Sequence, residues 1–506
     1  MGYRYILLIL TCKILFGQLS ITGSLKPTGM FRISDQSRMD LPFRLAELKL
    51  GYTMGDFDFM LNSAIEHRWG ENNPVFDLRE AYIVWFPNWG EIKFGKQIHA
   101  WGVADGNNPT DNLNAYDYYF MFLSGTDRKL GSLSAAMTIY WGDWQLEGVI
   151  IPDHIPNRMP FNEPDFPFQI SEPSKSDATD KTLPYEKIEN PIEYGLRLKT
   201  TVGETDVGIS YFNGKDRSFS LLGVDTFNII KIDPKIGYRE TSVFGLNVVT
   251  FIDDITIRAE AGYFTTENNY QESWFQYYDT KAEYVQYVIQ FEYRTVSSST
   301  IGAQLIGNHV LNAVGQTVDL LTMDQTTLNT DNFIPGLGTP FAMIAEQSLS
   351  ISGSETFFDE SLELNYNLLI NLEEKGQMVG INAAYSLIEN WSIDGSVSYF
   401  KGDDKPENSF EQLESGINDL FIFFLMGLAG GTGTLLLIYG ARKAELSKIM
   451  PFDYIEIFFA LILGWIFFRE WPVDQLFPGA LFIVAGGIII YLRQKNSIKT
   501  RDRKAS

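Results

Sequence analysis

The sequence is poor in the residues from which disulfides, zinc sites and many catalytic centres are built. It has one cysteine, Cys12, and four histidines, His67, His99, His154 and His309, in 506 residues. A single cysteine excludes an internal disulfide and a cysteine-based zinc site. The histidines lie far apart in the sequence, and no H-E-x-x-H, G-x-S-x-G or phosphate-loop motif occurs. We therefore predict that the chain is not an enzyme and carries no metal or cofactor.

Basic residues are also scarce. The 40 Lys and Arg are outnumbered by 63 Asp and Glu, which gives a formal net charge of −23. Nucleic-acid binding needs clustered Lys and Arg, so this charge excludes nucleic acid as a partner. Aromatic residues, at 14%, are plentiful by contrast. Because Tyr and Trp collect where proteins cross a membrane–water interface, the composition points towards the lipid bilayer as a partner.

The N-terminal residues have the order of an export signal. Arg4 is followed by the apolar residues Ile6–Leu10 and Ile14–Phe16, and small or polar residues run from Gly17 to Ser24. This order of charged, apolar and small residues is typical of a secretory signal. We predict a signal peptide over residues 1–24.

Residues 25–410 show the alternation of β-strands, in which successive side chains point to opposite faces. From Ile192 to Thr201, apolar residues alternate with charged residues and glycine, and the pattern recurs in residues 255–263, 285–294, 362–372 and 391–399. Strands of about ten residues with one apolar and one charged face fit a tilted crossing of a membrane. Turn residues at Gly55–Asp56, Gly203–Glu204, Asp253–Asp254 and Glu389–Asn390 predict short hairpins.

The predicted fold class is therefore an all-β transmembrane antiparallel barrel of roughly 16–18 strands, followed by a C-terminal α-helical block of three transmembrane helices. The charged face would line the lumen, where pairs such as Arg258 with Glu260 and Glu193 with Arg197 form a polar channel. The candidate lumen-lining residues are Glu193, Arg197, Lys199, Arg258, Glu260, Glu292, Arg294 and Glu363. The alternative is a secreted β-sandwich or propeller, in which the apolar faces would form the core.

Two loops interrupt the strand pattern. Residues 152–191 hold eight of the 20 prolines, which predicts a long extracellular or lumen-folding loop because each proline removes a backbone donor. Residues 101–111 contain Asp105, Asn107 and Asp111, whose oxygens suit Ca²⁺ but whose spacing lacks the ligand series of an EF-hand. A network of turns is the favoured interpretation.

These features together resemble porin-like outer-membrane barrels of bacteria. The residues that carry the resemblance are the strand Glu91–Gln97 leading into Trp101-Gly102, the following Asn108-Pro109-Thr110-Asp111, and the segment Ile155-Pro156-Asn157-Arg158-Met159-Pro160. The resemblance implies an outer-membrane location and small solutes as cargo.

The last ninety residues are of a different kind. Apolar runs at Phe421–Ala441, Pro451–Phe468 and Leu476–Leu492 are each long enough to cross the bilayer as a helix. Gly427 and Gly431 form a G-x-x-x-G pair that permits close helix packing. Lys and Arg in the first connection and at the C-terminus predict that both are cytoplasmic. We predict a junction at residues 411–420, three membrane helices over 421–495 and a basic cytoplasmic tail over 496–506.

This region resembles the C-terminal part of EamA-type drug/metabolite transporters. The resemblance rests on Ala441-Arg442-Lys443-Ala444, Pro451-Phe452-Asp453-Tyr454, the run from Gly464 to Pro472, and Pro478-Gly479-Ala480. Its candidate helix-packing and motif residues are Gly427, Gly431, Pro451, Glu470 and Gly479. The family is built from two repeats of five helices, so three helices do not enclose a substrate path, and transport would need a missing transporter half from a partner chain.

The two halves imply different membranes, the outer membrane for the barrel and an inner-membrane type for the helices. An outer-membrane barrel normally finishes with a closing strand. Here either Asp419–Phe424 is a degraded closing strand or that strand has been lost. We predict that the chain is a fusion, natural or produced in sequence assembly, joined between Lys405 and Asn418. The function predicted is passive passage of small solutes through the barrel, as a single chain or an oligomer. The alternatives are an exported β-rich binding or structural domain tethered by three helices, and metabolite transport through the EamA-like part with a partner chain.

Overall fold

The chain divides into two compact units, residues 1–415 and 416–506. The computed structural model describes residues 18–402 apart from 72, 124, 168–187, 189, 226–232, 269–275, 278–279, 296–298, 319–324, 341–344 and 374–375. In that part of the chain, no helix is long and apolar enough to cross a membrane. The three predicted membrane helices, and the predicted join between Lys405 and Asn418, lie outside the described residues.

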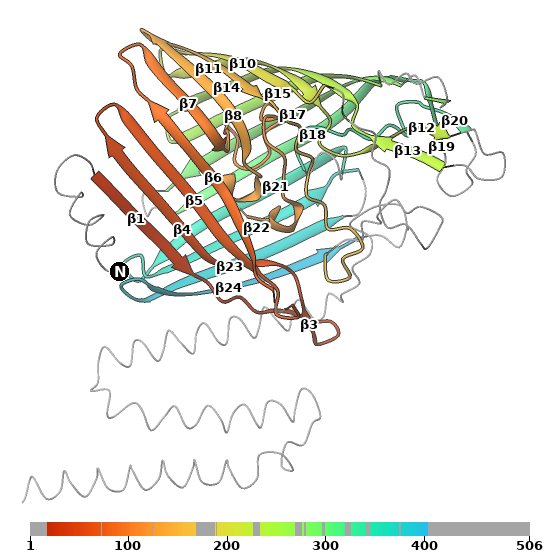
Figure 1. Cartoon of the computed structure of the whole chain (residues 1–506). Helices are drawn as coiled ribbons and strands as arrows, with labels where there is room; N and C mark the ends of the chain where they lie inside the picture. The colour runs from red at the N-terminus through yellow and green to blue at the C-terminus, as the bar shows by residue number, and fades with distance from the viewer. Residues whose placement is uncertain are drawn as a thin grey trace, which may run out of the picture. The chain divides into compact units, whose positions relative to one another are not determined.

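A single antiparallel sheet dominates the described residues and curls around an interior (Figure 1). It has 17 strands, each paired with the next in chain order through an antiparallel ladder. The strands are β1 (Gln18–Leu25), β4 (Phe43–Met54), β5 (Phe57–His67), β6 (Val75–Trp85), β7 (Gly90–Gln97), β8 (Ser132–Trp141), β9 (Trp144–Ile151), β10 (Glu193–Val202), β11 (Thr205–Lys215), β14 (Glu240–Ile252), β15 (Ile255–Glu267), β17 (Lys281–Arg294), β18 (Thr300–Val314), β21 (Gln347–Phe357), β22 (Leu362–Asn371), β23 (Gln377–Ile388) and β24 (Trp391–Lys401). The expectation of roughly 16–18 antiparallel strands is confirmed.

The two faces of this sheet carry apolar and polar side chains in the reverse of the arrangement that is usual in a soluble protein. On the outer face, Leu196, Phe291 and Ile393 are 50–60% exposed, and many other large apolar side chains on this face are exposed with them. On the inner face, Glu193 and Gln286 are fully buried. Apolar sides outward and polar sides inward are the arrangement of a membrane barrel, because lipid solvates the apolar side chains. The sandwich alternative is wrong for the described residues, because the apolar faces do not meet in a core.

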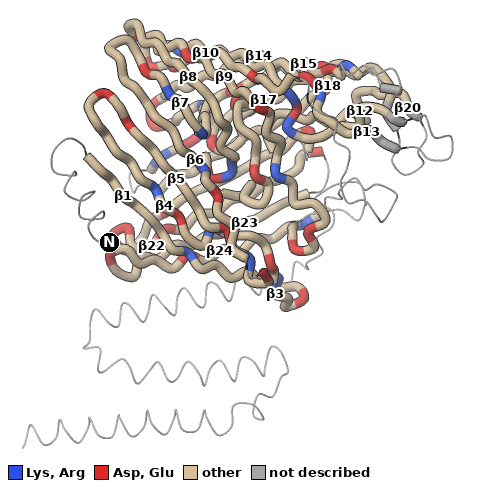
Figure 2. Tube along the Cα trace, viewed as in Figure 1, with Lys and Arg blue, Asp and Glu red and all other residues tan. Residues whose placement is uncertain are grey.

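Tight turns join consecutive strands at one end of the sheet. The four predicted hairpins at residues 55–56, 203–204, 253–254 and 389–390 are confirmed. Gly55, Gly203, Asp253 and Asn390 have φ between 52° and 65°, the left-handed conformation that Gly, Asn and Asp tolerate best. Acidic residues lie at several of these turns, at the tips of the hairpins (Figure 2).

The first and last strands of the sheet, β1 and β24, each have one neighbour. β1 pairs with β4, and β24 pairs with β23; between β1 and β24 the described residues contain no ladder. β1 also includes residues 18–24 of the predicted signal peptide. Leu19, Ile21 and Leu25 share the outer face with Tyr52, Leu50 and Ala46 of β4, respectively, and this alternation explains why the segment forms a strand. The rest of the predicted signal lies outside the described residues.

Shorter elements lie in the connections. They are the hairpin β2 (Met30–Arg32) with β3 (Ser37–Met39), the small sheet of β12 (Ser220–Asp225), β13 (Asp233–Gly237) and β16 (Gln276–Tyr277), the pair β19 (Gln316–Val318) and β20 (Gln325–Thr327), and the 3₁₀ turns η1 (Tyr118–Phe120) and η2 (Gly125–Arg128). The two 3₁₀ turns belong to residues 98–131, between β7 and β8, which we call the inner loop.

Candidate functional site

The inner loop crosses the interior of the sheet and is held there by Glu260 of β15. The Glu260 carboxylate accepts hydrogen bonds from the backbone N–H of Val103, from the backbone N–H of Ala104 at 2.8 Å and from the Thr110 hydroxyl at 2.8 Å. Glu260 is 3% exposed. A buried carboxylate that accepts several charge-assisted bonds is a strong anchor, so the loop is fixed to the wall at this point.

Next to this anchor, the loop presents a polar cluster that water still reaches. Asp105 accepts hydrogen bonds from Gln290 of β17 at 2.6 Å and from Arg258 of β15 at 3.3 Å, and its side chain is 69% exposed. Arg258 also binds Glu292 at 2.5 Å. Gln304 of β18 donates to the Asp105 carbonyl at 2.6 Å. One side of the inner loop is thus bonded to three consecutive strands while its charges stay hydrated.

The other side of the loop is bonded to the opposite part of the wall. Arg79 of β6 donates to the Asp127 carboxylate at 2.7 Å, and Arg44 of β4 donates to the Asp127 carbonyl at 2.6 Å. Strands β4 and β6 are separated from β15 by the strands β7 to β14 in the sheet order. One loop bonded to wall segments so far apart must span the interior and narrow it.

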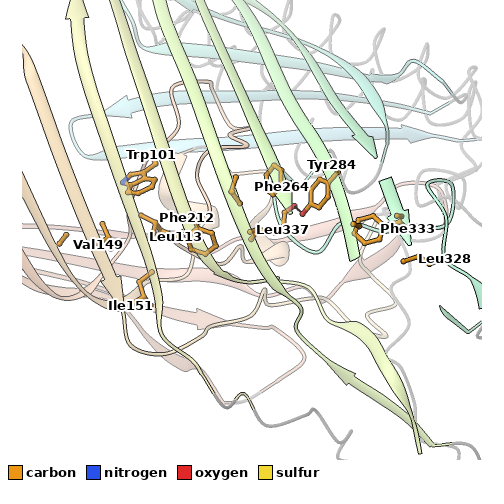
Figure 3. Close-up of a cluster of buried hydrophobic side chains, with 14 residues drawn as sticks. Trp101, Leu113, Val149, Ile151, Phe212, Phe264, Tyr284, Leu328, Phe333 and Leu337 are labelled. Carbon is orange, nitrogen blue, oxygen red and sulfur yellow. Dashed lines mark hydrogen bonds between the residues drawn. The ribbon is translucent and has the colours of Figure 1, made fainter. Parts of the chain in front are cut away.

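An apolar cluster seals the loop against the wall (Figure 3). Trp101 and Leu113 of the inner loop, each at most 1% exposed, pack with Phe212 of β11. Phe264 of β15 and Tyr284 of β17 stack with ring centroids 4.5 Å apart. The Tyr284 hydroxyl donates to the carbonyl of Leu337, which lies in the connection between β20 and β21, at 3.1 Å. These contacts bury apolar surface of the inner face under the inner loop.

The described start of the proline-rich loop lies against the inner loop. Arg158 donates to Asp117 and to Glu66 of β5, both at 3.0 Å, and Asn157 accepts from the backbone N–H of Tyr116 at 2.8 Å. Burial raises the pKa of Asp117 to about 6, and the charge of Glu66 adds to this shift, while Arg158 opposes it. Asp117 therefore changes charge near pH 6, although its side chain is buried between the two loops and the wall.

A fully enclosed ion-pair group lies behind these loops. Glu193 of β10 binds Arg217 at 2.5 Å and accepts a hydrogen bond from His154 at 2.8 Å. Arg217 also donates to the carbonyl oxygens of Asn112 and Leu113 in the inner loop, both at 3.1 Å. Because its side chains are at most 3% exposed, this group positions the loops and does not line the water.

The structure places the candidate lumen-lining residues on the inner face but pairs them differently from the sequence expectation. The predicted pairs Arg258 with Glu260 and Glu193 with Arg197 do not occur among the ion pairs of the described residues. Arg197 binds Glu147 of β9 instead, at 2.6 Å. Residues two or four apart on a strand share a face, yet the closest side chains come from neighbouring strands or loops.

The remaining candidates take varied positions. Lys199 is half-buried on the same face as Arg197, Arg294 is exposed at the end of β17, and Glu363 is exposed and accepts from Asn365 at 3.0 Å. In the loop weighed for Ca²⁺, Asn107 donates to Gln304 and Asp111 binds Lys129. No cluster of three or more His, Cys, Asp or Glu suited to a metal is found within the described ranges. Gly427, Gly431, Pro451, Glu470 and Gly479 lie outside them.

Sequence patterns missed several residues of the site. Arg44, Arg79 and Arg158 bind acidic side chains of the inner loop, and Gln290 and Gln304 bind its backbone. The two glutamines lie in strands whose apolar and polar residues alternate, so the sequence predicts that their side chains point to the inner face. Their partners lie more than 180 residues away in sequence, and no local signal connects the two.

Comparisons with known proteins give two kinds of match. Residues 399–492 match the EamA-like transporter family. The structure is similar to OmpT, an outer membrane protein of Vibrio cholerae, at 10% identity, covering 76% of this chain and 100% of that chain with a TM-score of 0.38. It is also similar to OccK2 (OpdF) of Pseudomonas aeruginosa at 9% identity, covering 78% and 93% with a TM-score of 0.41, and to OccK8 (OprE) at 12%, covering 76% and 92% with 0.39. No curated protein matches the chain.

Proposed function

We propose that this chain, which joins a porin-like barrel wall to an EamA-like segment, lets small polar solutes pass passively through an outer membrane. The observation that carries the proposal is the hydrated cluster beside the inner loop. Asp105 is 69% exposed, although it lies on a loop that crosses the interior. Water that reaches a charged group beside an inserted loop provides a path for small solutes, and the loop limits their size.

The distribution of charge along this path supports selection by charge as well as size. Arg258 is 22% exposed and Glu292 is 23% exposed, so both signs are available next to Asp105. Charged side chains in a narrow, partly dehydrated passage act on ions over several ångströms with little screening. Removal of one of them changes which ion passes more readily.

Planar-bilayer recording of the full chain tests the proposal. We expect stepwise conductance, and a reversal potential in a KCl gradient that shifts towards anion preference in Asp105→Asn. The matched control is Asp56→Asn, an acidic residue in the turn between β4 and β5, which should leave the reversal potential unchanged. Absence of channel steps, or an equal shift in both variants, would contradict a passage beside Asp105.

The match to EamA-like transporters favours a second function, metabolite transport through residues 399–492 together with a partner chain. The three helices that the sequence predicts would not enclose the path of that family by themselves, so this second function includes a second polypeptide that completes it. Fractionation on a sucrose gradient separates the two proposals. We expect the chain in the outer-membrane fraction with heat-modifiable gel mobility; recovery in the inner membrane with a bound partner supports the transporter and the tethered domain instead. A peptide spanning residues 401–418 in a membrane digest tests whether the fusion exists in the cell.

A further inference from the structure

One sector of the inner face carries hydroxyl and carboxamide side chains in place of charges. Two adjacent rows of inner-face positions cross the strands from β21 to β24 and hold only Ser, Asn and Gly. We call these eight residues the amide–hydroxyl patch. The next row towards the hairpin turns contains Glu363 and Asp394 and ends the patch. One row of the patch consists of Ser352, Asn367, Gly380 and Ser398, and the other of Ser354, Asn365, Asn382 and Ser396.

The centre of the patch is open to water, and the ladder fixes its geometry. Ser352 and Asn367, which stand opposite each other, are both exposed. Gly380 stands on the other side of Asn367, and a Cβ atom there would collide with the side-chain oxygen of Asn367. Glycine at position 380 therefore leaves the space in which the Asn367 carboxamide lies. A solute that enters the interior meets hydrogen-bonding groups on a rigid wall.

The patch adjoins the hydrated cluster beside the inner loop. Gly302 of β18 pairs with Ser352 on one side and with Glu292 of β17 on the other. A single inner-face position, occupied by a glycine, thus separates this charged group from the patch. The solute path that we propose beside Asp105 therefore continues along the patch.

An apolar row borders the patch on the side away from the hairpin turns. It consists of Leu369, Met378 and Phe400, on β22, β23 and β24. The Phe400 ring contacts Phe122 of the inner loop edge to face, with ring centroids 5.9 Å apart. Because Phe122 is 42% exposed, an aromatic surface is accessible beside the hydrogen-bonding groups.

This combination matches the chemistry of an uncharged sugar. Serine hydroxyls and asparagine carboxamides each donate and accept hydrogen bonds, as sugar hydroxyls do. The C–H face of a sugar ring is apolar and packs against aromatic side chains, which Phe122 provides here. With strands about 4.8 Å apart and the two rows two residues apart, the patch covers roughly 14 Å by 7 Å. Such an area suits several linked sugar rings better than a single ion.

We propose that the amide–hydroxyl patch binds a neutral oligosaccharide during its passage through the barrel. The two rows bond the hydroxyl groups of the sugar, and Phe122 covers its C–H face. This inference rests on the proposed passage of small polar solutes and names the class of solute. The charged cluster at Asp105 sets the preference among ions, whereas the patch sets the preference among uncharged solutes.

Single-channel recording of the full chain in planar bilayers tests the proposal. The probe is maltotriose, a neutral trisaccharide, and the measured quantity is the concentration that halves the open-channel current. Two comparison probes are trigalacturonate, a charged trisaccharide, and a polyethylene glycol of the same hydrodynamic radius, whose ether oxygens accept but do not donate hydrogen bonds.

The variants separate hydrogen bonding from size. Ser352→Ala/Asn367→Leu removes two hydrogen-bonding side chains without changing charge, and Gly380→Ala displaces the Asn367 carboxamide while every polar group is kept. The matched control is Ser210→Ala, which removes an inner-face hydroxyl of β11 opposite Arg197, outside the patch.

We expect maltotriose to block the unchanged chain at lower concentration than either comparison probe. Its half-blocking concentration should rise about tenfold in Ser352→Ala/Asn367→Leu, should rise in Gly380→Ala, and should stay the same in Ser210→Ala. The reversal potential in a KCl gradient should not change in Ser352→Ala/Asn367→Leu.

Two kinds of failure are distinguishable. Channel steps with equal block by maltotriose and polyethylene glycol, stronger block by trigalacturonate, or an equal effect of Ser210→Ala overturn this inference and leave the proposed passage intact. Absence of channel steps in the unchanged chain overturns the proposed function and this inference with it.

Discussion

The sharpest consequence of the structure concerns the anchor of the inner loop. Replacement of Glu260 by alanine removes the acceptor for three backbone N–H groups, those of Val103, Ala104 and Thr110, and for the Thr110 hydroxyl. Hydrogen bonds to a charged group contribute roughly 1.5–3 kcal/mol each. The four bonds share one carboxylate and are not additive, and one of them is long, which gives roughly 3–4 kcal/mol for the anchor. At 1.4 kcal/mol for each factor of ten, the ratio of detached to attached loop rises by about two to three orders of magnitude.

Single-channel recording measures this change. In Glu260→Ala, we expect larger conductance and frequent switching between conductance levels, because the detached loop no longer narrows the interior. Glu260→Gln keeps one oxygen acceptor and should lie between the alanine variant and the unchanged protein. Glu363→Ala is the matched control, since Glu363 also faces the interior but bonds only Asn365 among the described contacts. Identical conductance and noise in Glu260→Ala and Glu363→Ala would refute the anchoring role.

Three further predictions follow from individual contacts. Because burial raises the pKa of Asp117 to about 6, lowering the pH through 6 protonates its carboxylate and removes a negative charge, so the reversal potential should shift towards anions in that window and not in Asp117→Asn. Phe264→Ala removes a stacked ring from the apolar cluster, with a cost of roughly 3–5 kcal/mol, and should lower the temperature at which the folded band disappears on a gel; Phe251→Ala, on a side chain that is 54% exposed, should leave that temperature nearly unchanged. Phe291→Lys places a charge on the lipid-facing side and should reduce refolding yield into vesicles, because a lysine there costs up to roughly 2–4 kcal/mol at the bilayer midplane and less towards the surface. Thr256→Lys, beside Glu292 on the inner face, should refold normally, and equal yields would contradict the assignment of the two faces.

Much of the wall was predictable because its physical signal is local. The alternation in residues 192–201 and 285–294 indicates which side of each strand meets lipid. A shift of the strand by one residue would exchange its lipid-facing and inner-facing side chains. Turn residues such as Asp253 and Asn390 marked the hairpins, since few residues adopt positive φ. The apolar runs after Phe421 likewise indicated an EamA-like segment, and the match over residues 399–492 confirms that resemblance.

The pairing of charges was not predictable in the same way. Arg258 and Glu260 are two residues apart and share a face, so their proximity suggested a pair. Instead, Glu260 is saturated by the inner loop, and Arg258 binds Glu292 across the ladder and Asp105 from the loop. The partners of the Glu260 carboxylate lie about 150 residues away in sequence, and only folding brings them within hydrogen-bond distance.

The sequence alone determined the class of this protein, because hydrophobic alternation, turn chemistry and the apolar runs near its end depend only on neighbouring residues and on the solvent that each face meets. Tertiary structure decided the rest. It set the course of the inner loop across the interior and the choice of Glu260 as its anchor. Each of these requires that segments far apart in the chain meet, and such meetings depend on the closure, register and direction of the whole sheet.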